Sequence, residues 1–274
     1  MTTFLNNKLA FIGGGNMARS LIGGLIAQGM VPGNITVSDP MAAQRELLAQ
    51  QYKVHVTDNN QAAVRDVQVV VLAVKPQELR RVAEDLKSAL QHKPLIISVA
   101  AGMRASDLEQ WLGLPIVRTM PNRPALNGCG MTGMYAASGI TTSQRELALQ
   151  IMSAVGKAVW VEQEKLIDAV TAVSGSGPAY FFLLMELLEA AGVEQGLSAD
   201  VARTLAIETA YGSGYMAREL PDSPATLREQ VTSKGGTTEA ALKIFASRDL
   251  KQIVSDAVRA ATDRSAEMAV QMAK

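Results

Sequence analysis

A glycine-rich segment near the N-terminus has residue types and spacing that could do chemistry. Residues 9–12 are apolar and lead into Gly13-Gly14-Gly15-Asn16-Met17-Ala18, which has the spacing Gly-x-Gly-x-x-Ala. In such a segment the first glycine allows a tight turn, the second lets a phosphate approach the backbone, and the small third residue lets a helix pack on a strand. The N-terminus of a helix predicted over residues 19–28 would offer free N–H groups to a pyrophosphate. The segment predicts a dinucleotide-binding turn, and an ordinary tight turn is the alternative.

A second segment combines a Gly-Gly turn with hydroxyl side chains, in the sequence Ser233-Lys234-Gly235-Gly236-Thr237-Thr238-Glu239. A helix is predicted over residues 237–246, and the N–H groups and dipole at its N-terminus suit an anion as small as a carboxylate. Because Ser and Thr before helices commonly serve as caps, a cap at Thr237 or Thr238 is an equal alternative.

The region that must position the glycine turn alternates strands with helices up to about residue 160. Strands are predicted over residues 35–38, 67–74, 95–99, 116–120, 131–136 and 158–161, and helices over 19–28, 77–90 and 143–155. The nearly continuous β-branched run at 67–74 is typical of a strand covered on both faces of a parallel sheet. The pattern predicts an α/β fold, with a Rossmann-type doubly wound parallel sheet domain over residues 1–163.

After about residue 164 the strand pattern ends, and an all-α dimerisation domain is predicted over residues 164–274. Helices are expected over 166–173, 179–191, 198–220, 224–232, 237–246 and 249–272, with a break at 174–178. The run 179–191 is apolar almost all round, as is typical of a helix that is buried on every side. Because so small a helical domain encloses little interior, a second subunit is expected to cover this helix.

Small and polar residues follow the predicted strands, at the edge where an open α/β sheet binds its ligand. They are Ser38-Asp39, Ala73-Val74-Lys75-Pro76, Ala100-Ala101 and Pro121-Asn122. Each alone fits a turn that starts a loop, but as a set they favour a binding surface. Asp39 would suit the ribose hydroxyl of NAD, whereas the Ser38 hydroxyl and the amides of residues 59 and 60, both Asn, would suit the 2′-phosphate of NADP. The residues leave NADP(H) and NAD(H) both open.

The composition excludes several classes of function. The chain of 274 residues is 48% hydrophobic, 19% charged and 4% aromatic and has a formal net charge of zero, so neither nucleic acid nor an anionic membrane is an expected partner. One cysteine, Cys129, and two histidines, His55 and His92, supply no His/Cys metal cluster and no internal disulfide, so no metal is expected. The N-terminus lacks the apolar core of a signal peptide, and no apolar stretch reaches the ~20 residues that span a bilayer. The protein is predicted to be soluble and cytoplasmic.

Five segments in this order resemble the pyrroline-5-carboxylate reductase family over essentially the whole chain. They are residues 11–18, 73–76, 117–122 (Val-Arg-Thr-Met-Pro-Asn), 173–180 (Val-Ser-Gly-Ser-Gly-Pro-Ala-Tyr) and 235–239 (Gly-Gly-Thr-Thr-Glu). The last two are much more specific to the family than the glycine turn. The resemblance implies NADPH-dependent reduction of the cyclic imine 1-pyrroline-5-carboxylate to L-proline. It also implies a homodimer with interleaved helical domains and assembly into a decamer.

The resemblance further implies a role for each matching residue. The cofactor would be bound by Gly13, Gly15, Asn16, Met17, Ser38, Asp39, Asn60, Ala73, Val74, Lys75, Pro76, Ala100 and Ala101. The substrate would be bound by Ser233, Gly236, Thr237, Thr238 and Glu164. Thr238, expected near the ring nitrogen, is the catalytic candidate.

Three positions depart from the family pattern, and two other functions remain to be weighed. Lys234 stands where many relatives have proline, Arg123 where many have threonine, and Asp39 where a neutral or basic residue is common, so the choice between NADPH and NADH stays open. A 3-hydroxyacid-dehydrogenase-like oxidoreductase would need a lysine within residues 166–173, which contain none. A non-catalytic NADP sensor would have no use for the two threonines at 237 and 238.

Overall fold

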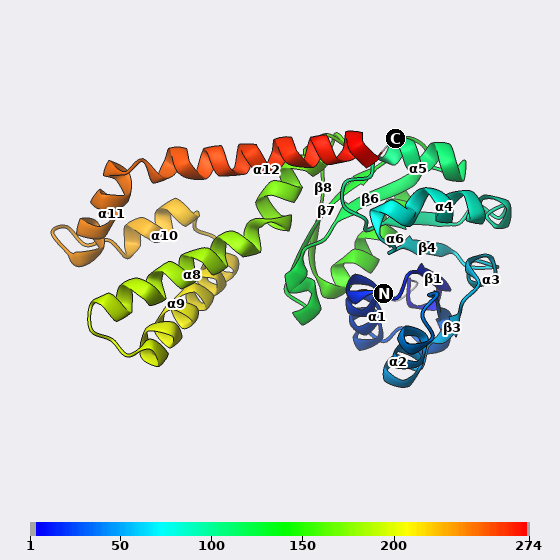
Figure 1. The fold of residues 1–274 in the computed structure, drawn as a ribbon, viewed down its shortest axis with the longest axis horizontal. Coiled ribbons are helices and arrows are strands. Elements are labelled where there is room, and N and C mark those ends of the chain that lie inside the picture. Colours follow the sequence, from blue (N-terminus) through cyan, green and yellow to red (C-terminus); the bar gives the residue numbers. More distant parts are fainter. Residues whose placement is uncertain (1–3, 273–274) are drawn as a thin grey trace. The chain divides into compact units, whose positions relative to one another are not determined.

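The computed structural model describes residues 4–272 and divides into two compact units (Figure 1). The first, called the α/β unit, comprises the described residues up to Gly175 together with those from Ala261 onward. The second, called the helical unit, comprises Ser176–Ala260. The ends of the two predicted domains, residues 1–3 and 273–274, lie outside the described residues.

The α/β unit is built on an eight-stranded sheet with the order β3-β2-β1-β4-β5-β6-β7-β8. The strands are β1 Leu9–Ile12, β2 Ile35–Ser38, β3 His55–Thr57, β4 Val69–Leu72, β5 Leu95–Ser98, β6 Ile116–Met120, β7 Gly130–Ala136 and β8 Gly156–Trp160. All neighbours pair in parallel except β6 and β7, which are antiparallel. Because β1 lies between β2 and β4, the strand order reverses at β1, and a crevice at such a reversal is where doubly wound sheets bind dinucleotides.

Helices cover both faces of this sheet, which confirms the doubly wound prediction. They are α1 Asn16–Ala27, α2 Ala42–Tyr52, α3 Asn60–Ala63, α4 Pro76–Leu86, α5 Ala105–Leu112, α6 Thr142–Met152 and α7 Leu166–Val170. Since side chains alternate along a strand, Leu9 and Phe11 of β1 pack with α1 and α6, whereas Ala10 and Ile12 pack with α4 and α5. Every residue of β1, β4 and β5 is buried, as parallel strands between two helical layers require.

The helical unit contains α8 Gly177–Glu194, α9 Ala199–Glu219, α10 Pro224–Gln230, α11 Thr237–Ser247 and the first part of α12, Leu250–Met272. Helices α8 and α9 lie side by side and are joined by only four residues (Figure 1). Apart from Gly177, the buried residues of α8–α11 are Ala202, Ala206 and Leu227. The unit therefore has almost no interior of its own.

The break expected at residues 174–178 is confirmed in part: a π-helical turn, Thr171–Gly175, follows α7, and Ser176 is a bend that caps the start of α8 at Gly177. The Thr171 hydroxyl donates to the Ile167 carbonyl at 2.8 Å and the Ser174 hydroxyl to the Val170 carbonyl at 3.0 Å. Such side-chain bonds occupy carbonyls that a widened turn leaves loosely paired, and single π-turns often occur at functional sites.

The resulting helical segment, Leu166–Glu194, is long and apolar enough by length and composition to cross a membrane, with 17% of its most apolar window buried. The expectation that no apolar stretch is long enough to span a bilayer is thus wrong for this helical segment, because the turn at 171–175 joins two shorter apolar runs. Helices buried at a subunit interface pass the same test, since both environments favour apolar side chains.

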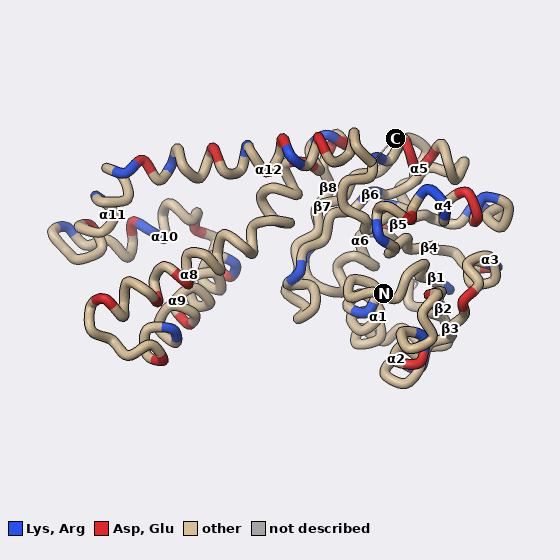
Figure 2. Tube along the Cα trace, in the orientation of Figure 1, with Lys and Arg blue, Asp and Glu red and all other residues tan. Residues whose placement is uncertain are grey.

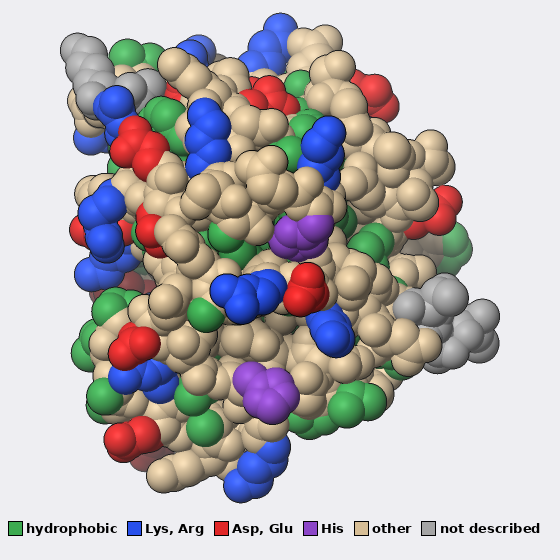
Figure 3. Space-filling model, turned by 90° about the vertical axis from the view of Figure 1, so that its right-hand side faces the viewer, with side chains coloured by type: hydrophobic (Ala, Val, Ile, Leu, Met, Phe, Trp, Pro, Cys, Tyr) green, Lys and Arg blue, Asp and Glu red, His purple; other side chains and the backbone are tan. Residues whose placement is uncertain are grey.

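Charged side chains of both signs are interspersed along the chain (Figure 2). On the face drawn in Figure 3, Lys and Arg lie among Asp and Glu, and histidine side chains lie at the surface. Many charges are paired locally, as in the i,i+3 pair Arg81–Glu78 on α4, at 2.8 Å. Such exposed pairs contribute little stability and form no field of one sign.

Candidate active site

The glycine turn after β1 is held so closely against β4 that only glycine fits its first position. The Gly13 N–H donates to the Ser38 carbonyl at 2.8 Å, and the Ala73 N–H donates to the Ile12 carbonyl at 2.8 Å. Gly13 has φ +96°, and a Cβ there would lie 2.7 Å from the Ala73 oxygen. The turn therefore lies at the carboxyl ends of the neighbouring strands β1 and β4, where the strand order reverses.

The third glycine and the start of α1 form an open cradle. Gly15 is the N-cap of α1, has φ −66° and makes no side-chain cap, and a Cβ added to it would meet nothing within 4 Å. The first N–H groups of a helix have no intrahelical acceptor, so those of Asn16 and Met17 can bond an anion. This geometry fits a dinucleotide pyrophosphate and explains the Gly-x-Gly spacing at Gly13 and Gly15.

The end of β2 supports the turn from the other side. The Asp39 carboxylate accepts the N–H of Gly14 at 2.8 Å and that of Met41 at 2.9 Å. It holds the glycine turn directly, and a carboxylate retains lone pairs that can accept further bonds. Asp39 therefore has a structural role as well as its predicted place near the adenosine ribose.

The two asparagines at 59 and 60 differ in what their side chains do. Asn59 caps α3 by accepting the Ala62 N–H at 2.9 Å. The Ser38 hydroxyl donates to Oδ1 of Asn60 at 2.7 Å, so the Nδ2 group of Asn60 is not used in this bond and can donate to another acceptor. Of the two, Asn60 is the better candidate for the cofactor.

The ends of β4 and β5 offer mainly backbone and small side chains. Lys75 is the N-cap of α4 and Pro76 its first residue, with no side-chain cap, so this helix N-terminus is also open. After β5, the Val99 N–H donates to the Leu72 carbonyl at 3.1 Å, and Ala100 is buried. Ala73, Ala100 and Ala101 thus lie after neighbouring strands on the same edge as the glycine turn, where a flat ring could approach the backbone.

The Glu164 carboxylate has its own partners within the α/β unit. Its Oε1 atom accepts the Ala105 N–H at 2.6 Å and the Arg118 guanidinium at 2.9 Å. Arg118, which lies on β6 with a side chain 4% exposed, was not singled out from the sequence. A charged residue within the apolar strand 116–120 was the available signal, since a buried charge must be paired.

Glu109 on α5 lies close to the same carboxylate. Burial raises the pKa of its carboxyl above the usual value, and the negative charge of Glu164 raises the pKa further.

The hydroxyl cluster lies in the helical unit and does not cap α11. The N-cap is Gly236, without a side-chain cap, so the capping alternative for Thr237 and Thr238 is wrong. Gly235 has φ +72°, and its N–H donates to the Glu239 carboxylate at 2.6 Å. A Cβ on Gly236 would collide with the Ser233 hydroxyl. The threonine hydroxyls are thus placed at an open helix N-terminus that suits a carboxylate.

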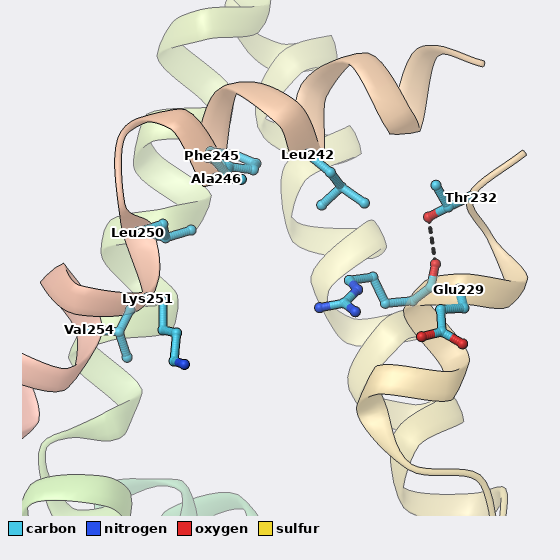
Figure 4. Close-up of a pocket in the computed structure, with 9 residues that line it drawn as sticks. Glu229, Thr232, Leu242, Phe245, Ala246, Leu250, Lys251 and Val254 are labelled. Atoms are coloured by element: carbon cyan, nitrogen blue, oxygen red, sulfur yellow. Dashed lines mark hydrogen bonds between the residues drawn. The ribbon is translucent and has the colours of Figure 1, made fainter. Parts of the chain in front are cut away.

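An apolar groove of about 740 Å³ also lies within the helical unit (Figure 4). Its lining residues are Arg228, Glu229, Thr232, Leu242, Phe245, Ala246, Leu250, Lys251 and Val254. The Thr232 hydroxyl donates its proton to the Arg228 carbonyl at 2.6 Å. None of the predicted substrate residues lines this groove.

Among residues 4–272, which the structure describes, no group of three or more His, Cys, Asp or Glu side chains could hold a metal ion. His55 is exposed at β3, and Nε2 of His92 lies 3.1 Å from the Val67 carbonyl oxygen. The exposed Cys129 is free.

Two family models match the chain. The model described as pyrroline-5-carboxylate reductase dimerisation matches residues 164–268, and the model described as NADP oxidoreductase coenzyme F420-dependent matches residues 8–102. The second matched segment contains the glycine turn, and the first contains the hydroxyl cluster.

Relatives match over nearly the whole length. The pyrroline-5-carboxylate reductase of Pseudomonas aeruginosa is 50% identical over 267 residues, covering 97% of this chain and 98% of the relative. A solved structure of a pyrroline-5-carboxylate reductase from Coxiella burnetii superimposes with a TM-score of 0.93 at 42% identity, over 96% of this chain and 98% of that one. The Plasmodium falciparum pyrroline carboxylate reductase, solved with NADP bound, gives a TM-score of 0.82 at 29% identity, over 96% and 98%.

Proposed function

We propose that this chain, which belongs to the pyrroline-5-carboxylate reductase family, reduces the C=N bond of 1-pyrroline-5-carboxylate with NADPH and forms L-proline. The observation that carries the proposal is the open cradle at Gly15, where the uncapped start of α1 meets the reversal of the strand order. It fits the pyrophosphate of a nicotinamide dinucleotide, and the match over 97% of the chain to a reductase at 50% identity supports the substrate.

Residues of the α/β unit would hold and orient the cofactor. When bound, NADPH supplies the hydride. Residues Gly13–Met17 bind the pyrophosphate, and Ser38 and Asn60 bind the adenosine end. Residues 73–76, 100 and 101 would line the nicotinamide, mainly with backbone and small side chains. NADH is the second candidate cofactor because Asp39 places a negative charge at the end of β2.

Residues of the helical unit would hold the substrate. Ser233, Gly236 and Thr237 bind its carboxylate at the open N-terminus of α11, where the free N–H groups and the helix dipole favour an anion. Thr238 places its hydroxyl at the ring nitrogen, where the hydroxyl oxygen accepts the N–H of the protonated imine. Because a protonated imine is already electrophilic, the site needs alignment and one hydrogen-bond partner at the nitrogen rather than a strong acid. Glu164, with its carboxylate on Arg118 and Ala105, is the weaker substrate-side candidate.

The helical unit would pair with that of a second copy, as the match to a dimerisation model over residues 164–268 supports. Five such dimers would assemble into a decamer in the cytoplasm. The apolar surface of α8 supplies the area that such pairing would bury.

The variant Thr238→Ala tests the site. It should lower kcat/KM for pyrroline-5-carboxylate by roughly 10- to 100-fold, as expected when one hydrogen bond of ~1.5–3 kcal/mol to a charged group is lost. Oxidation of NADPH, followed at 340 nm, measures the rate. Because Thr238 is not the cap of α11, the melting temperature should hardly change.

Thr142→Ala, in the first turn of α6, is the matched control and should change neither quantity. Unchanged kinetics in Thr238→Ala would remove this residue from the site. A wild-type protein that binds NADPH but does not oxidise it with this substrate would instead favour an NADP sensor.

A further inference from the structure

A partly buried cluster of charges, centred on the buried Arg118, joins four segments of the α/β unit. Arg118 on β6 donates to the Glu164 carboxylate at 2.9 Å and lies 3.9 Å from that of Asp168 on α7. The Ser265 hydroxyl on α12 donates to the Asp168 carboxylate at 2.7 Å. The Ala105 N–H at the start of α5 donates to Glu164 at 2.6 Å.

This cluster determines where the last turns of α12 lie against the sheet. A guanidinium as buried as that of Arg118 has to be paired, so Glu164 and Asp168 cannot move away without leaving its charge alone in the interior. Ser265 is itself buried, and its bond to Asp168 ties α12 to the pair.

The same face of α12 continues onto the loop that follows β5. Ser265, Met268 and Met272 recur at the spacing of one helical face. A Cβ built on Gly102 would lie 3.1 Å from Sδ of Met272 and 3.8 Å from Cβ of Met268. Met272 also packs against the apolar core beneath α4 and α5. The end of α12 therefore covers the loop 99–104.

The loop 99–104 leaves β5 at the carboxyl edge of the sheet, and both of its ends are fixed. At its start Val99 bonds to β4, and just after it the Ala105 N–H bonds to Glu164. In a doubly wound sheet the β1-β2-β3 half takes one nucleotide and the half with β4, β5 and β6 takes the other. The acidic residue after β2 marks the adenosine half, so the loop lies on the nicotinamide side.

We propose that the Arg118 cluster and the last turns of α12, residues 261–272, position the loop 99–104 against the nicotinamide ring. Ser265, Asp168 and Met272 are positioning residues, because they act through the loop and touch neither ring nor substrate. The proposal rests on the proposed function, since that function assigns the nicotinamide to this edge.

Binding of two ligands to the full-length protein separates this role from a merely structural one. NADPH carries the nicotinamide, whereas 2′,5′-ADP contains only the adenosine half with its phosphates. In Ser265→Ala and in Met272→Ala, the Kd of NADPH should rise about 5- to 10-fold and kcat should fall by a similar factor, while the Kd of 2′,5′-ADP stays within about twofold. Calorimetry gives both constants without turnover.

Matched variants sharpen the result. Ser265→Thr, which keeps the hydroxyl, should restore the NADPH affinity. Val270→Ala, on the same turns of α12 at a half-exposed position, should leave both affinities unchanged. Met272→Ala removes no polar group, so it decides the question even where a variant of the charged cluster fails to fold.

Equal weakening of NADPH and 2′,5′-ADP, or a lower melting temperature with an unchanged ratio of the two constants, would overturn the proposal. Failure of the proposed function gives a different result. If the wild-type protein binds both ligands and the variants change their ratio, but no pyrroline-5-carboxylate is reduced, the positioning role stands and the substrate is wrong. If the wild-type protein binds neither ligand, both proposals fail.

Discussion

The α/β unit and the helical unit bury their apolar side chains very differently. In the α/β unit the central strands are fully buried between two layers of helices. In the helical unit large apolar side chains of α8 remain exposed, among them Phe181 at 64% and Leu187 at 56%. Exposed apolar surface of this extent marks an interface. The contrast teaches that the first unit contains its own core, whereas the second becomes a folded interior only when another chain covers it.

The variant Phe181→Asp should prevent the apolar surface of the helical unit from pairing with another chain, and it has the largest expected effect. A charge placed at the centre of an apolar interface should weaken self-association about 100-fold or more, as loss of a central aromatic residue commonly does. Sedimentation equilibrium at micromolar concentration should show a monomer, while the Kd of 2′,5′-ADP stays unchanged because the glycine turn belongs to the other unit. Val31→Asp, at a similarly exposed apolar position of the α/β unit, is the control. An oligomer that survives Phe181→Asp would place the interface elsewhere.

The variant Gly15→Val should weaken cofactor binding by the α/β unit without disturbing its apolar core. Its side chain enters open space at an ordinary φ, so the melting temperature and oligomeric state should be unchanged. The KM for NADPH should rise roughly 10- to 100-fold, because the branched side chain occupies the path of the pyrophosphate. Gly13→Ala is the contrasting variant: it should also lower stability, since a Cβ there meets the Ala73 carbonyl. A normal KM in a well-folded Gly15→Val protein would contradict the cradle.

The variant Asp39→Ser distinguishes two roles of this residue in the α/β unit, which are to support the glycine turn and to influence the choice between NADPH and NADH. Removing the negative charge should favour NADPH over NADH by about tenfold in kcat/KM, the factor that ~1.4 kcal/mol of repulsion represents. Loss of the bond to the Gly14 N–H should lower stability by about 1 kcal/mol. Steady-state kinetics with both cofactors measure the ratio, and Asp85→Ser on α4 is the control. A ratio that does not move would leave Asp39 with its structural role alone.

The smallest expected effect concerns Glu109, a partly exposed residue of α5 in the α/β unit. Because its folded pKa is raised, the unfolded chain loses this proton first, and the stability that the protonated form contributes is lost as pH rises above the ordinary value of a carboxyl. Glu109→Gln should therefore melt at a slightly higher temperature than the wild type at pH 7 and at the same temperature near pH 4. Thermal melts at both values test this. A variant less stable at pH 7 would show that the ionised carboxyl is favoured by the fold.

Local patterns of residues were sufficient to predict the α/β fold and its glycine turn. The strand Ile116–Met120 was predicted with its observed ends, and the turn at Gly13–Gly15 lies where the spacing indicated. These features depend on short-range sterics and on the alternation of side chains along a strand, both of which are visible in a window of a few residues. Short helices such as α3 and α5 were not predicted, because one or two turns give too weak a period.

Features that depend on distant partners required the folded chain. The sequence alone determined the class of fold, the nucleotide turn and the family that its motifs resemble. Only the tertiary structure decided that Asp39 holds Gly14, that Gly236 rather than a threonine caps α11, and that a π-helical turn at 171–175 links α7 to α8. It also brought Arg118 to Asp168, and Asp168 to Ser265, across separations of tens of positions along the chain. A buried charge shows in the sequence that it needs a partner, but burial and hydrogen-bond geometry select which partner it takes.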